Sequence, residues 1–295
     1  MNILLLGKTG QVGHELHRTL SPLGPILAPG RRELDLTSEQ AVADYLEAHH
    51  PDLIVNAAAW TAVDAAEEQQ TEARRLNAGL PEQLAKYAAE QGAFLVHYSS
   101  DYVYPGNGTE PWQENSATGP LSVYGQTKLE GDQAIAQSGC EHLIFRTSWV
   151  YSARGNNFMK TMLRLAQSKP QLNIVADQIG APTPARLIAQ VTTLAIHSNI
   201  ATGLYHLAPA GETSWHGFAQ EIFRQATEQG EQLAMGPNNA HSIPTSDYPT
   251  PATRPLNSRM ALNKLETALN IQLPTWQSQL ALTLGEYLET GATKA

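Results

Sequence analysis

The chain has 295 residues, of which 42% are hydrophobic and 16% charged, a composition that excludes a disordered chain and leaves room for one large domain or two modest ones. Its formal net charge of -9 argues against partners such as nucleic acid or an anionic membrane surface, because the field of the protein repels polyanions. Cys140 is the single cysteine, which excludes an intrachain disulfide and a thiolate metal cluster.

The start of the chain shows no targeting signal. Met1 and Asn2 run directly into the apolar residues 3–6, without a basic leader or a cleavage site. No apolar stretch approaches the roughly 20 residues that cross a bilayer. We therefore expect a cytoplasmic protein, monomer or homodimer, without a membrane partner.

Up to residue 149, short apolar runs alternate with helical patterns. We expect buried strands at 3–6, 53–55, 94–98 and 143–145, with helices around 12–20, 42–46, 76–87 and 128–135 between them. This alternation predicts an α/β fold, a doubly wound parallel sheet of the Rossmann type with helices on both faces.

Beyond residue 149 the rhythm loosens, with proline and glycine clusters at 180–184, 209–211 and 244–255. We expect one domain at 1–149 and a smaller α/β cap at 150–295. A helix from about 186 to 197 is expected to pack back on the first sheet.

A glycine motif follows the first strand. Gly7, Gly10 and Gly13 have the spacing G-x-x-G-x-x-G and lead into a helix that begins near Gln11 and Val12. Glycine lets the backbone turn sharply and approach a pyrophosphate, which the free N–H groups and the dipole of the helix start attract. The alternative, an ordinary strand-to-helix turn, does not require glycine at all three positions. The motif therefore predicts a dinucleotide site.

Residues 25–33, where the second strand of a dinucleotide-binding sheet would end, bear on the choice of cofactor. Arg31 and Arg32 can grip a 2′-phosphate, which favours NADP(H), whereas a solvated basic turn is the alternative and Glu33 keeps NAD(H) open. Asp35 and Leu36 follow where an adenine edge is read. The third strand ends at 56–59, the expected topological switch point at which such sheets bind ligands.

A second motif lies at the start of the fourth helical pattern. Tyr124 and Lys128 are four residues apart and so share one helix face. An adjacent ammonium and a nicotinamide cation would lower the phenol pKa from about 10, so that Tyr124 can move a proton. Ser100, at the end of the preceding strand, can hydrogen-bond the same carbonyl oxygen. Such a pair also occurs by chance on exposed helices, but its combination with the glycine motif favours catalysis.

These residues resemble the short-chain dehydrogenase/reductase superfamily, in the extended branch that acts on nucleotide sugars. Within it, the chain resembles the dTDP-4-dehydrorhamnose reductase family through HYSSDYV (97–103), IFRTSWVY (144–151), GNNF (155–158), DQIGAPT (177–183) and TRP (253–255). The resemblance implies an oxidoreductase that reduces the C4 ketone of dTDP-6-deoxy-L-lyxo-4-hexulose to dTDP-L-rhamnose with NAD(P)H. That reaction is the last step of dTDP-rhamnose biosynthesis, which feeds cell-surface polysaccharide such as O-antigen. The domain at 1–149 would bind the dinucleotide and the one at 150–295 mainly the substrate.

The resemblance also implies residue roles. Tyr124 would be the proton donor, Lys128 its partner and a ribose ligand, and Ser100, a threonine in many members, the hydroxyl that tunes the acid. The expected cofactor contacts, including those from the motifs above, are Gly7, Gly10, Gln11, Val12, Gly13, Arg31, Arg32, Asp35, Leu36, Ala59, Trp60, Thr61, Tyr98, Tyr124 and Lys128. The expected substrate contacts are Ser100, Asp101, Trp149, Asn157 and Arg254.

Two of the substrate contacts have structural alternatives. Trp149 is equally compatible with a core aromatic. Arg254 would pair with a phosphate, since an acidic chain needs a cation to bind a nucleotide, but a surface arginine in a proline-rich loop is the alternative.

Only the resemblance suggests a metal, because some members of the family are thought to dimerise through Mg²⁺ held by acidic helix residues. Glu15 is one candidate ligand. Arg186 stands where a second acidic ligand would be expected, and no motif supports a metal site. We therefore predict none.

Other enzymes and a non-enzyme share the expected fold. Sugar-nucleotide 4,6-dehydratases carry an Asp-Glu pair after the strand-end hydroxyl, whereas Asp101 is followed by Tyr102, which favours simple reduction. Two alternatives stay open: a reductase making another 4-epimer, such as dTDP-6-deoxy-L-talose, and a non-catalytic regulatory subunit. Retention of Ser100, Tyr124 and Lys128 speaks against the second.

Overall fold

A six-stranded, fully parallel sheet forms the centre of the protein, in a computed structural model that describes residues 1–292. The strand order is β2-β1-β3-β4-β5-β10. The strands are β1 (Ile3–Leu6), β2 (Ile26–Leu27), β3 (Leu53–Asn56), β4 (Phe94–Ser100), β5 (His142–Thr147) and β10 (Gly203–His206). The predicted doubly wound α/β sheet is confirmed, and β10 is an edge strand that the sequence pattern did not indicate.

The chain reverses its direction across the sheet at β1. Ile3 pairs with Ile26 of β2 on one side and with Leu53 of β3 on the other. The carboxyl ends of β1 and β3 therefore form the topological switch point, where sheets of this kind bind ligands. Residues 7–13 and 56–61, which the sequence marked as the cofactor region, leave the sheet at these two ends.

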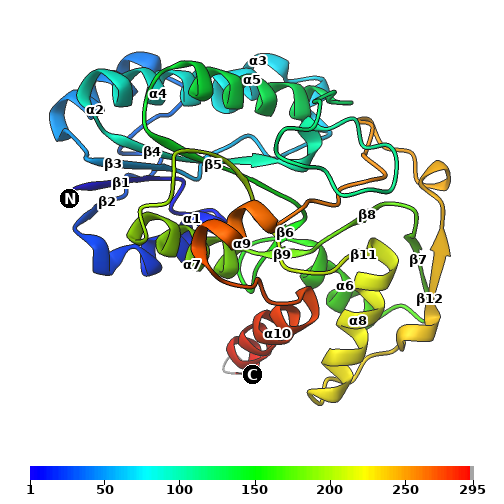
Figure 1. The fold of residues 1–295 in the computed structure, drawn as a ribbon. Helices are drawn as coiled ribbons and strands as arrows, with labels where there is room; N and C mark the ends of the chain where they lie inside the picture. Colours follow the sequence, from blue (N-terminus) through cyan, green and yellow to red (C-terminus); the bar gives the residue numbers. More distant parts are fainter. Residues whose placement is uncertain (293–295) are drawn as a thin grey trace.

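Helices cover both faces of the sheet (Figure 1). All residues of β1 and β3 are buried, as expected for parallel strands between two helical layers. One layer holds α2 (Glu39–His49), α3 (Gln70–Arg74), α4 (Leu80–Gln91) and α5 (Val123–Gln137). The other holds α1 (Gln11–Thr19), α7 (Ala185–His197) and α9 (Asn263–Leu269).

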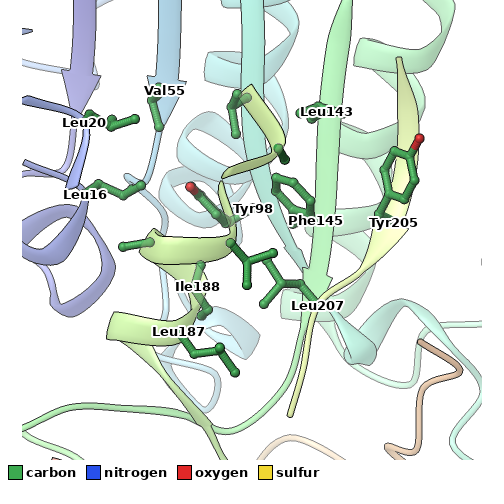
Figure 2. Close-up of a cluster of buried hydrophobic side chains, with 14 of the residues drawn as sticks. Leu16, Leu20, Val55, Tyr98, Leu143, Phe145, Leu187, Ile188, Tyr205 and Leu207 are labelled. Carbon is green, nitrogen blue, oxygen red and sulfur yellow. The ribbon is translucent and has the colours of Figure 1, made fainter. Parts of the chain in front are cut away.

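The layer of α1 and α7 closes over a hydrophobic cluster that Figure 2 shows in detail. Leu16 on α1 and Leu20, which caps the C-terminus of that helix, point to one side, and Ile188 of α7 reaches the same cluster. Each of these side chains is fully buried, and each such burial contributes about 1.5–3 kcal/mol before entropy is counted. The packing holds α1, which follows the glycine motif, against the sheet.

The C-terminal half forms a smaller cap around a second cluster. Its helices are α6 (Phe158–Ala166), α8 (Trp215–Glu228) and α10 (Trp276–Ala292). Its short paired strands are β6 (Val150–Tyr151) with β9 (Thr183–Pro184), β7 (Leu172–Val175) with β12 (Ala240–Ile243), and β8 (Ile179–Gly180) with β11 (Thr213–Ser214).

The chain passes between the two parts several times. Residues of α7, β10 and α9 belong to the hydrophobic cluster of the first sheet, although all three follow residue 149. A domain boundary at 149/150 stays a prediction. The hydrophobic cluster of the first sheet includes residues from both sides of that boundary. No helix in residues 1–292 is long and apolar enough to cross a membrane.

Candidate active site

The glycine motif forms a tight loop between β1 and α1. Gly7 has φ 85°, in the left-handed region, and a Cβ there would lie 2.7 Å from the carbonyl carbon of Ala57. A Cβ on Gly13 would lie 2.1 Å from the carbonyl oxygen of Gly7. Gly10 caps α1 without a side chain that could satisfy the first N–H groups of the helix. This cradle of free N–H groups fits the pyrophosphate of a dinucleotide.

A basic turn lies beside this loop. Arg31 and Arg32 are exposed, and the Lys8 ammonium lies 3.5 Å from the Glu33 carboxylate. Glu33 also accepts from Gly30 N at 2.5 Å, and this backbone hydrogen bond, with Lys8, lowers the pKa of its carboxyl. Glu33, the acid that kept NAD(H) open in the sequence, is thus bound by groups of the turn itself. Its partner Lys8 is a cation that the sequence analysis did not consider.

Asp35 and Leu36 continue from the basic turn. The Asp35 carboxylate accepts from both the backbone N and the hydroxyl of Thr37, which lowers the pKa of Asp35. Leu36 is half-buried against the cluster under α2 and α4. Their contact with an adenine stays a prediction.

The loop after β3, with Ala59, Trp60 and Thr61, is held by a buried asparagine. Asn77 accepts from Trp60 N at 2.9 Å and donates to Trp60 O at 3.1 Å. It also donates to the hydroxyl of Thr127 on α5. Asn77 lies in a π-helical turn, Arg75–Gly79, that precedes α4 within a segment expected as regular helix. Such turns are common at functional sites.

Ser100 and Tyr124 meet where β4 ends and α5 begins. Tyr124 is the second residue of α5, whose first turn is capped by the Ser122 side chain through Gly125 N. Ser100 accepts from Tyr102 N and donates to Asp101. The Tyr124 ring packs edge-on against Tyr102, with centroids 5.3 Å apart.

The expectation of a lowered phenol pKa is wrong for the chain's own groups. Burial raises the pKa of Tyr124 to about 12, and a hydrogen bond with Ser100 opposes this only in part. The reason is that Lys128, although on the same helix face, directs its ammonium elsewhere. Its Nζ donates to Tyr98 O at 2.6 Å and lies 3.2 Å from His97 Nε2.

Lys128 is almost completely buried, with 2% of its surface exposed. Burial lowers the pKa of its ammonium to about 8, and the negative charge of Asp132 opposes that shift. Asp132 is itself paired with Arg146 at 3.0 Å and accepts from Ser99 at 2.9 Å. The lysine therefore lies in a buried polar layer with Asp132, Arg146 and His97.

Tyr98, expected beside the nicotinamide, has its side chain in the hydrophobic cluster under α7. Its hydroxyl lies 2.9 Å from Thr192 Oγ1, and burial raises its pKa. Only its backbone carbonyl reaches Lys128. Its contact with a nicotinamide stays a prediction.

Asp101 offers an unsatisfied acceptor beside Ser100. Its side chain is 1% exposed, and burial raises its pKa to about 6. Oδ1 accepts from Ser100, whereas Oδ2 forms no hydrogen bond of ordinary geometry among the residues described, although the Ser258 hydroxyl is close enough to lower the pKa of the carboxyl. A buried carboxylate oxygen without a partner fits a ligand hydroxyl that donates to it.

Trp149 is stacked on Trp215, the first residue of α8. Trp149 has φ 48°, a left-handed conformation that is strained for a bulky residue. Trp215 donates from its indole N–H to Gln178 at 3.0 Å, which fixes its ring. The two indoles are each half-buried, so Trp149 is neither a full core residue nor a free surface one.

Asn157 and Arg254 are engaged within the protein. The Asn157 side chain caps α6 through Lys160 N and donates to Gln11 Oε1 at 2.8 Å, which ties the cap to the glycine loop. Arg254 Nη2 donates to Asp64 at 2.8 Å, while its buried Nη1 has no partner in the described part of the chain. Their contacts with substrate stay predictions.

The acidic residue raised as a metal ligand does not fit one. Glu15 lies 3.8 Å from the Arg186 guanidinium, which also pairs with Glu286 at 2.5 Å. A fixed cation thus lies where Mg²⁺ would need open carboxylates. Residues 1–292 hold no cluster of three or more His, Cys, Asp or Glu that could bind a metal.

Comparisons with known proteins extend over nearly the whole chain. Residues 1–289 match the family described as "RmlD substrate binding domain". The curated dTDP-4-dehydrorhamnose reductase of Shigella flexneri is 48% identical over 300 residues, covering 99% of this chain and 100% of the relative. Its namesake from Salmonella typhimurium is 49% identical over 298 residues, covering 98% and 99%. The crystal structure of dTDP-4-dehydrorhamnose reductase from Bacillus anthracis in complex with NADP matches with a TM-score of 0.89 at 32% identity, covering 97% and 99%.

Proposed function

The chain belongs to the RmlD substrate binding domain family, and we propose that it is a dTDP-4-dehydrorhamnose reductase. It reduces the C4 ketone of dTDP-6-deoxy-L-lyxo-4-hexulose to the alcohol of dTDP-L-rhamnose with NAD(P)H. One observation supports this most directly: Ser100 and Tyr124 meet at the end of β4, on the same sheet edge as the glycine cradle.

The chemistry needs one hydride and one proton. NAD(P)H supplies the hydride when bound, and the chain's residues supply the proton. A phenol with a pKa raised to about 12 is fully protonated at neutral pH, which is the state a proton donor to the ketone oxygen requires. When substrate is bound, the Ser100 hydroxyl would turn from Asp101 Oδ1, to which it donates in this structure, and donate to that oxygen as charge develops on it. The raised pKa therefore suits reduction better than the reverse oxidation.

Lys128 would act on the tyrosinate that remains after proton transfer only through the buried layer, since its ammonium is directed at Tyr98 O and His97 rather than at the phenol. Its ammonium lies in a buried layer, where a charge acts more strongly than in water. Because burial lowers the pKa of Lys128 to about 8, this support weakens as the pH rises above that value.

The cofactor preference is the less direct part of the proposal. Arg31, Arg32 and Lys8 surround the turn at Gly30, and Glu33 is tied to that turn rather than offered to a ribose. Because Lys8 and Glu33 neutralise each other, the turn offers the two exposed arginines, which favour a 2′-phosphate and hence NADP(H) over NAD(H). The NADP in the Bacillus anthracis structure supports this choice.

The proposed substrate contacts are made by polar and aromatic groups of the site that the protein leaves without a full set of partners. The unpartnered Oδ2 of Asp101 would accept from a sugar hydroxyl, and the Trp149 face would pack on the sugar ring. Arg254 Nη1 would donate to a phosphate. We keep monomer or homodimer, and a cytoplasmic location, as predictions.

The proposal is tested by the product as well as by the rate. NADPH absorbance is followed while the protein meets dTDP-6-deoxy-L-lyxo-4-hexulose, and the product sugar is identified by NMR. Oxidation with dTDP-L-rhamnose as product is expected. A talose product would keep the chemistry and reject the stereochemistry, and tight NADPH binding without oxidation would favour a regulatory subunit.

A further inference from the structure

A chain of three buried side chains leads from the cofactor loop to Lys128. Asn56 ends β3, His97 lies on β4 and Lys128 on α5. Asn56 Nδ2 lies 3.2 Å from His97 Nδ1, and His97 Nε2 lies 3.2 Å from Lys128 Nζ. All three side chains are 1–2% exposed. Water therefore cannot satisfy any member that lacks a partner, and the donors and acceptors must match among themselves.

The orientation of the Asn56 amide sets the first link. Asn56 Oδ1 accepts from Ala58 N at 3.2 Å, so its NH₂ group faces His97. His97 Nδ1 must then accept, and a neutral imidazole carries its one proton on Nε2. That N–H faces Lys128 Nζ, which can accept only as a neutral amine. The amine still donates to Tyr98 O.

The protonated lysine requires the opposite arrangement. An ammonium has three donors and no acceptor, so His97 Nε2 must accept from it and the imidazole proton must sit on Nδ1. The Asn56 amide must then turn to offer its oxygen to Nδ1–H, and Ala58 N loses its acceptor. The two arrangements differ by one proton, which leaves from the lysine, while the imidazole keeps one proton in both.

We propose that Asn56, His97 and Lys128 form a hydrogen-bond relay in which the proton of neutral His97 sits on Nδ1 when Lys128 is charged and on Nε2 when it is neutral. His97 is thereby a positioning residue for Lys128. His97 thus offers an acceptor to the charged lysine and a donor to the neutral one. The rotation of the Asn56 amide also decides whether Ala58 N has an acceptor, and this backbone N lies against Gly7 in the cofactor loop.

The electrostatics around the relay agree with this assignment. Burial and the neighbouring Lys128 hold the pKa of His97 well below 6.5, so the imidazole stays neutral while Lys128, with a pKa lowered to about 8, titrates. The other charged group that faces Lys128 is Asp132, which is paired with Arg146. Burial raises the pKa of Tyr124 to about 12, above the range in which Lys128 titrates, and the Arg146 guanidinium opposes the rise that burial causes in the pKa of Asp132.

The tautomer of His97 is directly measurable. In ¹⁵N-labelled wild-type protein, two-bond ¹H–¹⁵N spectra between pH 6 and 10 distinguish Nδ1–H from Nε2–H imidazoles. We expect His97 to change from Nδ1–H to Nε2–H with a midpoint at the titration of Lys128, which the lysine side-chain resonances report. One unchanging tautomer across that titration would overturn the relay.

The same spectra contain an internal control. His206 is equally buried and neutral, and burial lowers its pKa to about 3. Its Nδ1 lies 3.1 Å from the carbonyl of Ala261, which can only accept, so His206 stays Nδ1–H throughout. In the Lys128→Met variant, His97 should lose its pH-dependent change, and persistence of that change would reject the coupling to Lys128.

The kinetic consequence rests on the proposed function, whereas the NMR test does not. His97→Phe keeps a ring but removes both nitrogens, so the ammonium loses a charge-assisted acceptor and the pKa of Lys128 falls. The alkaline limb of kcat/KM should move to lower pH by about 0.5–1 unit. His97→Gln, whose amide can donate or accept, should restore it to within a few tenths of a unit. Equal limbs in all three proteins would reject a positioning role, while absent turnover in wild type would reject only the function.

Discussion

Trp149 and Trp215 stack with ring centroids 3.8 Å apart and planes 14° from parallel. Trp149 follows β5 of the first sheet and Trp215 opens α8 of the cap, so the pair joins the two parts at the site. A left-handed conformation such as that of Trp149, with φ 48°, costs about 1–3 kcal/mol for a bulky residue. The stack is a contact that offsets this strain.

Trp215→Leu should therefore raise the KM for the sugar nucleotide about 3- to 10-fold, because Trp149 is no longer held in place. The Kd for NADPH should stay unchanged, since Trp215 lies in the cap. Steady-state kinetics and a thermal melt measure both effects. Trp215→Phe keeps an aromatic face and is the matched control, expected to retain most of the affinity. An unchanged KM in Trp215→Leu would show that the stack does not position Trp149.

The pair formed by Arg254 and Asp64 gives predictions of opposite sign. If Arg254 Nη1 donates to a phosphate, Arg254→Gln should raise the Kd for dTDP about tenfold and leave thymidine binding unaltered. Asp64→Asn removes the competing anion and should leave dTDP binding equal or tighter. Calorimetric titration of both ligands measures this. Equal losses for dTDP and thymidine would mean that Arg254 only anchors its loop.

The basic turn should discriminate between the two cofactors. Replacing Arg31 and Arg32 together by alanine removes two cations that would face a 2′-phosphate, so the KM for NADPH should rise at least about tenfold. The KM for NADH should change less than about twofold. Paired assays with both cofactors, repeated at higher salt, provide the measurement. A parallel rise for NADPH and NADH would assign the arginines to something other than the 2′-phosphate.

The buried charge of Lys128 should lower the free energy of unfolding of the protein. Its folded pKa of about 8 lies below the ordinary 10.5, a difference of about 3 kcal/mol. The folded state binds fewer protons between these two values, so the cost is complete below pH 8 and disappears as the pH rises to 10.5. Lys128→Met, after loss of its hydrogen bonds, should gain about 1–2 kcal/mol of unfolding free energy at pH 7.

Urea melts at several pH values test this difference in stability. The gap between Lys128→Met and wild type should shrink from pH 8 to pH 10.5, while the exposed Lys86→Met on α4 should show no such change. A variant less stable than wild type at pH 7 would mean that the hydrogen bond to Tyr98 O outweighs the cost of burying the charge.

The sequence predicted those parts of the fold that local patterns determine. The apolar runs of β1, β3, β4 and β5 and the glycine loop were all located, because parallel strands and tight turns leave a local signature. β10 was missed, since its four residues, Gly203–His206, gain their place only by pairing with β5. The pairing of two segments far apart in the chain has no local signal.

The sequence predicted which residues form the site better than it predicted their contacts. The four-residue spacing correctly put Tyr124 and Lys128 on one helix face. It could not predict that the Lys128 ammonium would instead contact Tyr98 O and His97, because these residues lie some 30 positions away in the chain. Asn77, which holds the loop at Trp60, carries no motif. Asp64 and Arg254 are 190 positions apart, so their pairing requires the folded chain.

Single-turnover hydride transfer in Tyr124→Phe tests the central claim most directly. NADPH-loaded protein is mixed with dTDP-6-deoxy-L-lyxo-4-hexulose, and the loss of NADPH absorbance is followed beside wild type. Without the phenolic proton the rate should fall about 10²- to 10⁴-fold, while the Kd for NADPH and the thermal midpoint stay close to wild type. Hydride transfer at the wild-type rate in a correctly folded Tyr124→Phe would contradict the account.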